Sequence, residues 1–177
     1  FMSSLTFSKN LLNRRMYASK GSLFRVGVNL YSGTEKYMPG NILRDEVNFI
    51  PFSERQVRRN WFQAKLSREQ YPFHIKRYSF GYLTEVVISN KPGFSTYKST
   101  LLSAPAFYPL QDSKSLYLEK FRANTYAALG VKNVYKVSKN VDARAEFYIF
   151  QPLEEFKLKR LQSVGYGSLF AKNYLAA

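Results

Sequence analysis

The chain has 177 residues, a formal net charge of +15 and no cysteine, which excludes a disulfide framework and a thiolate metal site. It contains no apolar run of eighteen or more residues, so a transmembrane helix is excluded as well. Aromatic residues make up 17% of the chain, and this enrichment favours strands over other structures.

Apolar and polar residues alternate in several segments, and a period of two predicts strands with one apolar face. The clearest segment comes late, because Val141 to Phe150 has an apolar residue at every odd position and a charge at the first three even positions. We therefore expect about seven strands, which in chain order cover residues 1–8, 23–30, 61–69, 78–89, 123–132, 141–150 and, more weakly, 166–177.

The predicted strands are long and their connections alternate in length. Many strands have about ten to twelve residues, which is long for a soluble domain but suits a tilted strand that crosses a bilayer. Short links are expected at 71–78 and 136–141, and long polar loops at 32–60, 90–122 and 151–165, with 8–21 intermediate. Short turns at one end and long loops at the other are typical of outer-membrane barrels. The sequence thus predicts an all-β, antiparallel, up-and-down transmembrane β-barrel, of which residues 1–177 form part as a single domain.

The alternation also assigns the two faces of each strand. The apolar side chains predicted to face lipid are Phe24, Val28, Phe62, Leu66, Phe80, Val86, Leu129, Phe147 and Ile149. The polar side chains predicted to face the lumen are Arg25, Lys65, Glu85, Lys132, Asp142, Arg144 and Glu146. Aromatic residues near the predicted strand ends are expected to form interfacial girdles; these are Tyr31, Trp61, Tyr71, Tyr78 and Tyr135.

Charge complementarity predicts the register of the last long hairpin. A turn centred on Lys139 sets Lys136 opposite Asp142 and Lys132 opposite Glu146. Opposite charges directly across an antiparallel pair favour that register by ~0.2–1 kcal/mol each. The next register of the same parity would set Lys132 against Arg144, which is repulsive.

The excess of basic residues leaves a second interpretation open, a soluble basic β domain that binds nucleic acid or another polyanion. The Lys and Arg residues are scattered over strands and connections rather than gathered in one stripe, and no standard nucleic-acid motif occurs. We therefore expect no nucleic-acid partner. A steep salt dependence of polyanion binding would favour this second interpretation.

No pattern in the chain predicts catalysis. Gly165–Leu169 reads Gly-Tyr-Gly-Ser-Leu, which is not a nucleophile elbow, and neither a P-loop nor a dinucleotide-binding fingerprint occurs. His74 falls in a predicted turn and Glu154–Glu155 in a predicted loop, where solvated side chains are expected. We predict no catalytic residue, metal or cofactor.

Several segments, in their order along the chain, resemble one known family. They are Leu12–Leu23 (with Ala18 where the family has Pro), Ser32–Gly40, Trp61–Lys65, Leu101–Pro109, Phe121–Asn124 and Arg144–Pro152. They resemble the C-terminal barrel of Bacteroidetes-type patatin-like phospholipase proteins, a member of the bacterial surface antigen superfamily that is related to BamA and TamA. The likeness extends over most of the chain, and the first segment resembles a periplasmic turn of that barrel.

The resemblance implies a location in the bacterial outer membrane and a structural role. The barrel would anchor, position or translocate an N-terminal patatin-like lipase domain that this chain does not contain. The implied partners are outer-membrane lipids, the remaining strands of the same barrel and that N-terminal domain. The parent protein would be the phospholipase, and this chain would not itself be an enzyme.

Overall fold

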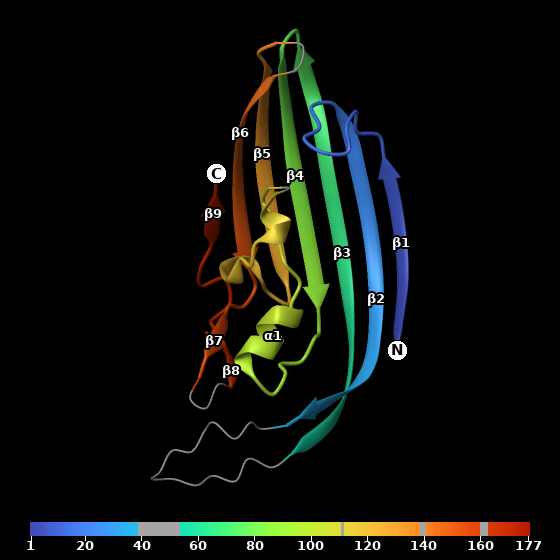
Figure 1. Ribbon diagram of the computed structural model, residues 1–177, viewed down its shortest axis with the longest axis vertical. Coiled ribbons are helices and arrows are strands. Elements are labelled where there is room, and N and C mark those ends of the chain that lie inside the picture. The colour runs from blue at the N-terminus through green and yellow to red at the C-terminus, as the bar shows by residue number, and fades with distance from the viewer. Residues whose placement is uncertain (39–53, 111, 139–140, 160–162) are drawn as a thin grey trace.

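The computed structural model describes residues 1–38, 54–110, 112–138, 141–159 and 163–177. Its main feature is one curved antiparallel sheet of seven strands (Figure 1). In spatial order these are β1 (Met2–Asn10), β2 (Gly21–Tyr37), β3 (Arg55–Ile75), β4 (Tyr78–Ser89), β5 (Tyr126–Lys136), β6 (Asp142–Pro152) and β9 (Tyr174–Ala176). The predicted all-β, antiparallel fold is confirmed. Within the described residues the sheet is not closed into a barrel, because β1 and β9 are its two edges.

Some predicted connections are shorter than the sequence suggested. β2 continues to Tyr37 and β3 begins at Arg55, so both strands extend into the predicted 32–60 loop, of which residues 39–53 lie outside the described residues. The predicted 71–78 link is wrong, because β3 runs to Ile75 and only Lys76 and Arg77 turn the chain. Lys76 takes the left-handed conformation, with φ at 52°, which a tight hairpin turn requires.

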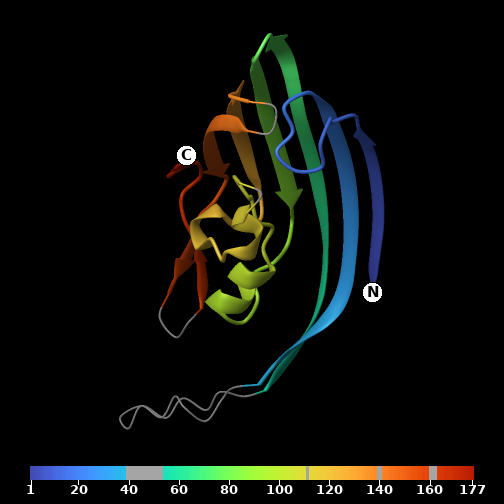
Figure 2. The same cartoon turned by 45° about the horizontal axis from the view of Figure 1, so that its top comes forward.

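The segment between β4 and β5 is not the polar surface loop that the sequence suggested. It contains α1 (Tyr97–Ser103) and two short 3₁₀ helices, η1 (Asp112–Ser115) and η2 (Glu119–Phe121), and it folds into the concave side of the sheet (Figure 2). Its Phe107 is only 1% exposed. The predicted 151–165 loop likewise contains β7 (Phe156–Leu158), which pairs with β8 (Val164–Tyr166). None of the helices in the described residues is long and apolar enough to cross a membrane.

Phe107 anchors this inward-folded segment in an aromatic cluster. Its ring stacks on Phe150 of β6 at 6.0 Å and meets Tyr148 edge-on at 6.0 Å and Tyr126 at 6.5 Å. Aromatic pairs at such distances contribute beyond their buried area. The largest apolar core of the described residues therefore lies inside the curve, between the sheet and the segment that it encloses.

The predicted register of the last hairpin is confirmed. β5 and β6 pair with Lys136 opposite Asp142 and Lys132 opposite Glu146. Two residues of the predicted turn, 139 and 140, lie outside the described residues. The charges themselves do not pair as the register suggested, because Lys132 forms its ion pair with Glu69 of β3 and Asp142 forms its own with Arg14.

Two glycines make room for tyrosine rings on the concave face. Gly130 of β5 lies directly opposite Tyr148 of β6, and a Cβ at Gly130 would lie 2.4 Å from the nearest atom of that ring. A Cβ at Gly81 of β4 would lie 2.5 Å from the ring of Tyr71. An aromatic ring laid over a strand glycine shields the backbone and fills the missing side chain's space.

We expect Gly130→Ala and Gly81→Ala each to lower the free energy of unfolding by about 1–3 kcal/mol, because the added methyl group must displace a packed ring. Gly33→Ala is the matched control, since no atom lies within 4 Å of a Cβ built there. Urea unfolding in dodecyl maltoside micelles, followed by Trp61 fluorescence, measures all three. A loss at Gly33 as large as at Gly130 would contradict the ring-over-glycine packing.

Candidate functional site: a charged cavity inside the curved sheet

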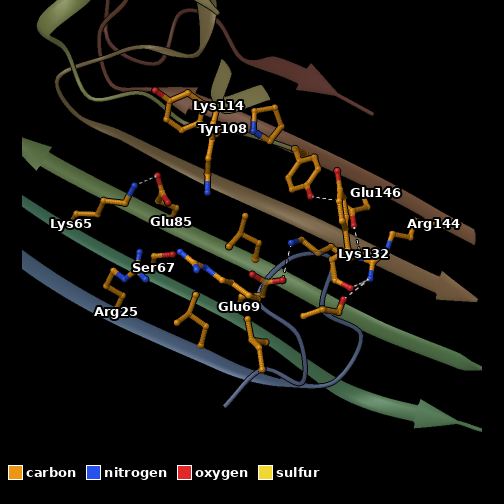
Figure 3. A pocket seen from close by; sticks show the side chains of 18 residues that line it. Arg25, Lys65, Ser67, Glu69, Glu85, Tyr108, Lys114, Lys132, Arg144 and Glu146 are labelled. Carbon is orange, nitrogen blue, oxygen red and sulfur yellow. Dashed lines mark hydrogen bonds and ion pairs between the residues drawn. The ribbon is translucent and has the colours of Figure 1, made fainter. Parts of the chain in front are cut away.

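The concave face of the sheet encloses a polar cavity of about 170 Å³ (Figure 3). Strands β2 to β6 form its floor, and the β1–β2 connection and the segment around η1 complete its wall. Charged side chains dominate the lining; they are Arg15, Arg25, Lys65, Glu69, Glu85, Lys114, Lys132, Arg144 and Glu146. Strict alternation along the strands brings those on β2 to β6 to one face, whereas Arg15 and Lys114 come from the β1–β2 connection and η1.

Glu69 of β3 is one of the buried charged residues in the cavity lining. One oxygen of its carboxylate, Oε1, accepts hydrogen bonds from Lys132 Nζ at 2.8 Å and from the Tyr71 hydroxyl at 3.0 Å. Lys132 lies on β5, so the ion pair crosses over β4, where Gly81 stands opposite Lys132 and carries no side chain. Glu69 and Lys132 are each 7% exposed, and a buried ion pair of this kind needs such additional hydrogen bonds.

Glu85 of β4 repeats the arrangement. Its Oε1 accepts from Lys65 Nζ on β3 at 2.7 Å and from the Tyr126 hydroxyl on β5 at 2.7 Å. The carboxylate therefore ties together three adjacent strands. Lys65 is more exposed than Lys132, so this pair is the more solvated of the two.

Glu146 of β6 forms the third such group. Arg144 Nη1 donates to its Oε1 at 3.1 Å, and the Tyr148 hydroxyl donates to Oε2 at 2.5 Å. The other terminal nitrogen of Arg144 donates to the backbone carbonyls of Tyr17 and Ala18. One guanidinium thus joins a strand carboxylate to the β1–β2 connection, which lies more than a hundred residues earlier in the sequence.

The β1–β2 connection folds over the end of the cavity. Ala18 is buried against Tyr71 and Val134, and Arg14 forms an ion pair with Asp142 of β6 at 2.8 Å. The Tyr17 hydroxyl donates to Asp112 of η1 at 2.5 Å, and that hydrogen bond raises the pKa of Tyr17. These contacts connect the two inward-folded segments to each other.

The structure places the predicted site residues on two faces. Of the residues predicted to face a lumen, Arg25, Lys65, Glu85, Lys132, Arg144 and Glu146 line the cavity, and Asp142 lies beyond it with Arg14. The predicted lipid-facing residues lie on the convex face. All of them are exposed except Phe80, which is half-buried; the exposed ones are Phe24, Val28, Phe62, Leu66, Val86, Leu129, Phe147 and Ile149.

Some site features were not predicted from the sequence. Glu69, Arg15 and Lys114 were missed as cavity residues, although Glu69-x-Tyr71 and Glu146-x-Tyr148 share a spacing of two that puts both side chains on one face. The prediction that aromatic residues near the strand ends form interfacial girdles is wrong for three of the five residues. Tyr31 and Trp61 stack on the concave face at 4.8 Å and Tyr71 is buried there, whereas Tyr78 and Tyr135 are exposed on the convex face.

A second buried cation lies at the start of the inward-folded segment. Lys91 is buried, hydrogen-bonds to Ser103 of α1 and lies over the ring of Phe94 at 4.7 Å and that of Trp61 at 6.0 Å. Burial lowers its pKa to about 8. Among the described residues the aromatic faces take the place of a carboxylate counter-ion, so Lys91 fixes α1 against the sheet.

No protein-family model, curated protein or solved structure matches the chain. Within the described part of the chain, no group of three or more His, Cys, Asp or Glu side chains is placed to hold a metal ion. The functional argument therefore depends on the geometry and charge of this sheet.

We expect Lys132→Met to lower the free energy of unfolding by about 3–5 kcal/mol, because it leaves the Glu69 carboxylate buried without a cation. The additional change Glu69→Gln should recover part of that loss. The matched control is Lys36→Met, which removes a solvent-exposed pair with Glu54 at 3.9 Å and should cost less than about 1 kcal/mol. Equal effects of Lys132→Met and Lys36→Met in urea unfolding would contradict this role of Lys132.

Proposed function

We propose that the chain is a segment of a bacterial outer-membrane β-barrel that anchors an N-terminal patatin-like lipase domain and positions or translocates it. The observation that carries the proposal is the inverted polarity of the sheet. On the convex face Leu129 and Phe147 are 57% and 58% exposed, whereas the charged Glu69 and Lys132 are enclosed on the concave face. An apolar outside around a polar inside is the pattern of a membrane barrel.

Strand dimensions support the proposal. β4, β5 and β6 have 12, 11 and 11 residues, and a tilted membrane strand needs about 9–11. On β3 the exposed aromatic residues Phe62 and Phe73 are eleven positions apart. At ~3.3 Å per residue and a tilt of ~45° they would be separated by ~26 Å along the membrane normal, close to the ~25 Å height of a barrel's apolar band.

The connections support an orientation. The tight turn at Lys76–Arg77, the end of β5 and the start of β6 lie at one end of the sheet, and the end of β2, the start of β3 and the β4–β5 connection lie toward the other (Figure 1). In the proposed barrel the first end would face the periplasm and the second the cell exterior. The β4–β5 segment would then occupy the lumen rather than extend outside.

Charged side chains also occur on the convex face. Arg68 of β3 lies there between Phe24 of β2 and Thr84 of β4, and Lys9 of β1 lies on the other side of Phe24. Arg68 donates to Gln70 Oε1 at 2.6 Å, and the same oxygen accepts from the Tyr82 hydroxyl at 2.8 Å. Arg68 is six positions from Phe62 and five from Phe73, so in the proposed barrel it would lie near the middle of the apolar band. There its hydrogen bond to Gln70 would offset part of the cost of a lipid-facing charge.

The two edges of the sheet add a requirement. Backbone groups that are left unpaired in lipid cost several kcal/mol each, so only closed barrels and helices span membranes. The proposal therefore needs further strands of the same protein to pair with β1 and with the opposite edge. These strands and the lipase domain would be its protein partners, and lipids would contact the convex face.

Leu129→Arg tests the convex face. In the intact protein folded into phospholipid bilayers we expect this change to cost about 2–4 kcal/mol, because a charge on the lipid face must be desolvated. The control Asn29→Arg adds the same side chain to the concave face and should cost less than about 1 kcal/mol. In water Leu129 is already exposed, so a negligible effect of Leu129→Arg in bilayers would overturn the membrane proposal.

Residues 1–177 without detergent should aggregate rather than form a monodisperse monomer, since the apolar convex face and both sheet edges would be exposed to water. Analytical ultracentrifugation measures this. A monodisperse monomer that unfolds cooperatively and binds polyanions with a steep salt dependence would instead favour the soluble basic β domain.

A further inference from the structure

The cavity inside the sheet carries more positive than negative charge. Six cationic side chains line it, against three carboxylates. Each of the carboxylates Glu69, Glu85 and Glu146 already accepts one cation and one tyrosine hydroxyl. The cavity lining therefore carries a net charge of +3, and its three carboxylates are already engaged.

The surplus comes from three separate segments. Arg15 belongs to the β1–β2 connection, Arg25 to β2, and Lys114 to η1 of the inward-folded segment. Within the described residues neither Arg15 nor Arg25 forms an ion pair. In Figure 3 Lys114 extends from above the sheet toward the Lys65–Glu85 pair, and Arg25 projects from the neighbouring strand. Like charges gathered in one enclosure repel one another unless an anion joins them.

We propose that this cavity binds a phosphate-type anion, a phosphomonoester or diphosphate group. Guanidinium groups form paired hydrogen bonds with phosphate oxygens, and an ammonium contributes a compact charge. Arg15 and Arg25, which form no ion pair within the described residues, would supply the paired donors to the negative oxygens of the anion. The volume has room for several water molecules, which suits the anionic group but not an acyl chain. The site does not depend on the membrane proposal, since the cavity lies within the sheet itself.

Calorimetric titration of the intact protein with pyrophosphate tests the site, in dodecyl maltoside micelles (a detergent without phosphate) or in buffer if the protein is soluble there. We expect saturable binding that Arg15→Gln and Arg25→Gln each weaken by about tenfold, since each removes a charged donor. Both residues are exposed at the cavity wall, so the fold should survive, and circular dichroism checks this. Arg25→Lys keeps the charge and should retain part of the affinity.

Arg55→Gln is the matched control, because it removes the same charge from β3 far along the strand from the cavity lining. Its affinity for pyrophosphate should stay within about twofold of the unchanged protein, as expected for a screened surface charge. The proposal is overturned if the unchanged protein shows no saturable binding, or if Arg55→Gln weakens binding as much as Arg25→Gln does.

A competition arm identifies the source of the anion. Phosphatidic acid added to the micelles should displace pyrophosphate if a lipid headgroup enters the cavity, and should leave the titration unchanged if the ligand is a soluble phosphate compound. Either result supports an anion site whose binding requires Arg15 and Arg25. Displacement that persists equally in Arg25→Gln would place the lipid elsewhere and overturn the shared site.

Discussion

Three carboxylates inside the curve, each holding a cation and a tyrosine hydroxyl, are the interactions on which the arrangement of this sheet depends. Glu69, Glu85 and Glu146 lie on β3, β4 and β6, and their partners come from β3, β5 and β6. A lone buried carboxylate would be costly, but charge-assisted hydrogen bonds from two donors offset much of that cost. The groups of Glu69 and Glu85 thus connect strands laterally, in addition to the backbone ladder, and Arg144 links the Glu146 group to the β1–β2 connection.

These polar groups also explain why two long segments fold inward. Arg144 binds the carbonyls of Tyr17 and Ala18, and Phe107 fills an apolar site beside Tyr148. The concave face therefore offers one polar and one aromatic docking surface next to each other. The β1–β2 connection takes the first and the β4–β5 segment takes the second, and the hydrogen bond from Tyr17 to Asp112 joins them.

The features that were predictable from the sequence are those that depend on near neighbours in the chain. The alternation in Val141–Phe150 identified β6, and its charges identified the register with β5. The partner of Lys132 was not predictable in this way. A flexible lysine selects among carboxylates on several strands, and Glu69 became its neighbour only through the order of β3, β4 and β5.

The inward fold of the β4–β5 segment could not be predicted from the sequence for the same physical reason. Its polar composition is typical of a surface loop, and Phe107, the aromatic residue that anchors it in the largest apolar core, gives no periodic signal. The rings that bury Phe107 come from Phe121, Tyr126, Tyr148 and Phe150, which lie 14 or more residues later. Only contacts distant in sequence determine whether such a segment leaves the sheet or fills it.

The inward fold changes what an enclosing sheet could do. An empty polar lumen would offer a continuous path, whereas here the β4–β5 segment and the β1–β2 connection divide the interior and leave a small cavity between them. Because Arg15 and Lys114 belong to those two segments and Arg25 to the sheet, an anion bound among the three would draw the segments toward the strands. The charge of the cavity and the positions of the two inward-folded segments would therefore be coupled through the same side chains.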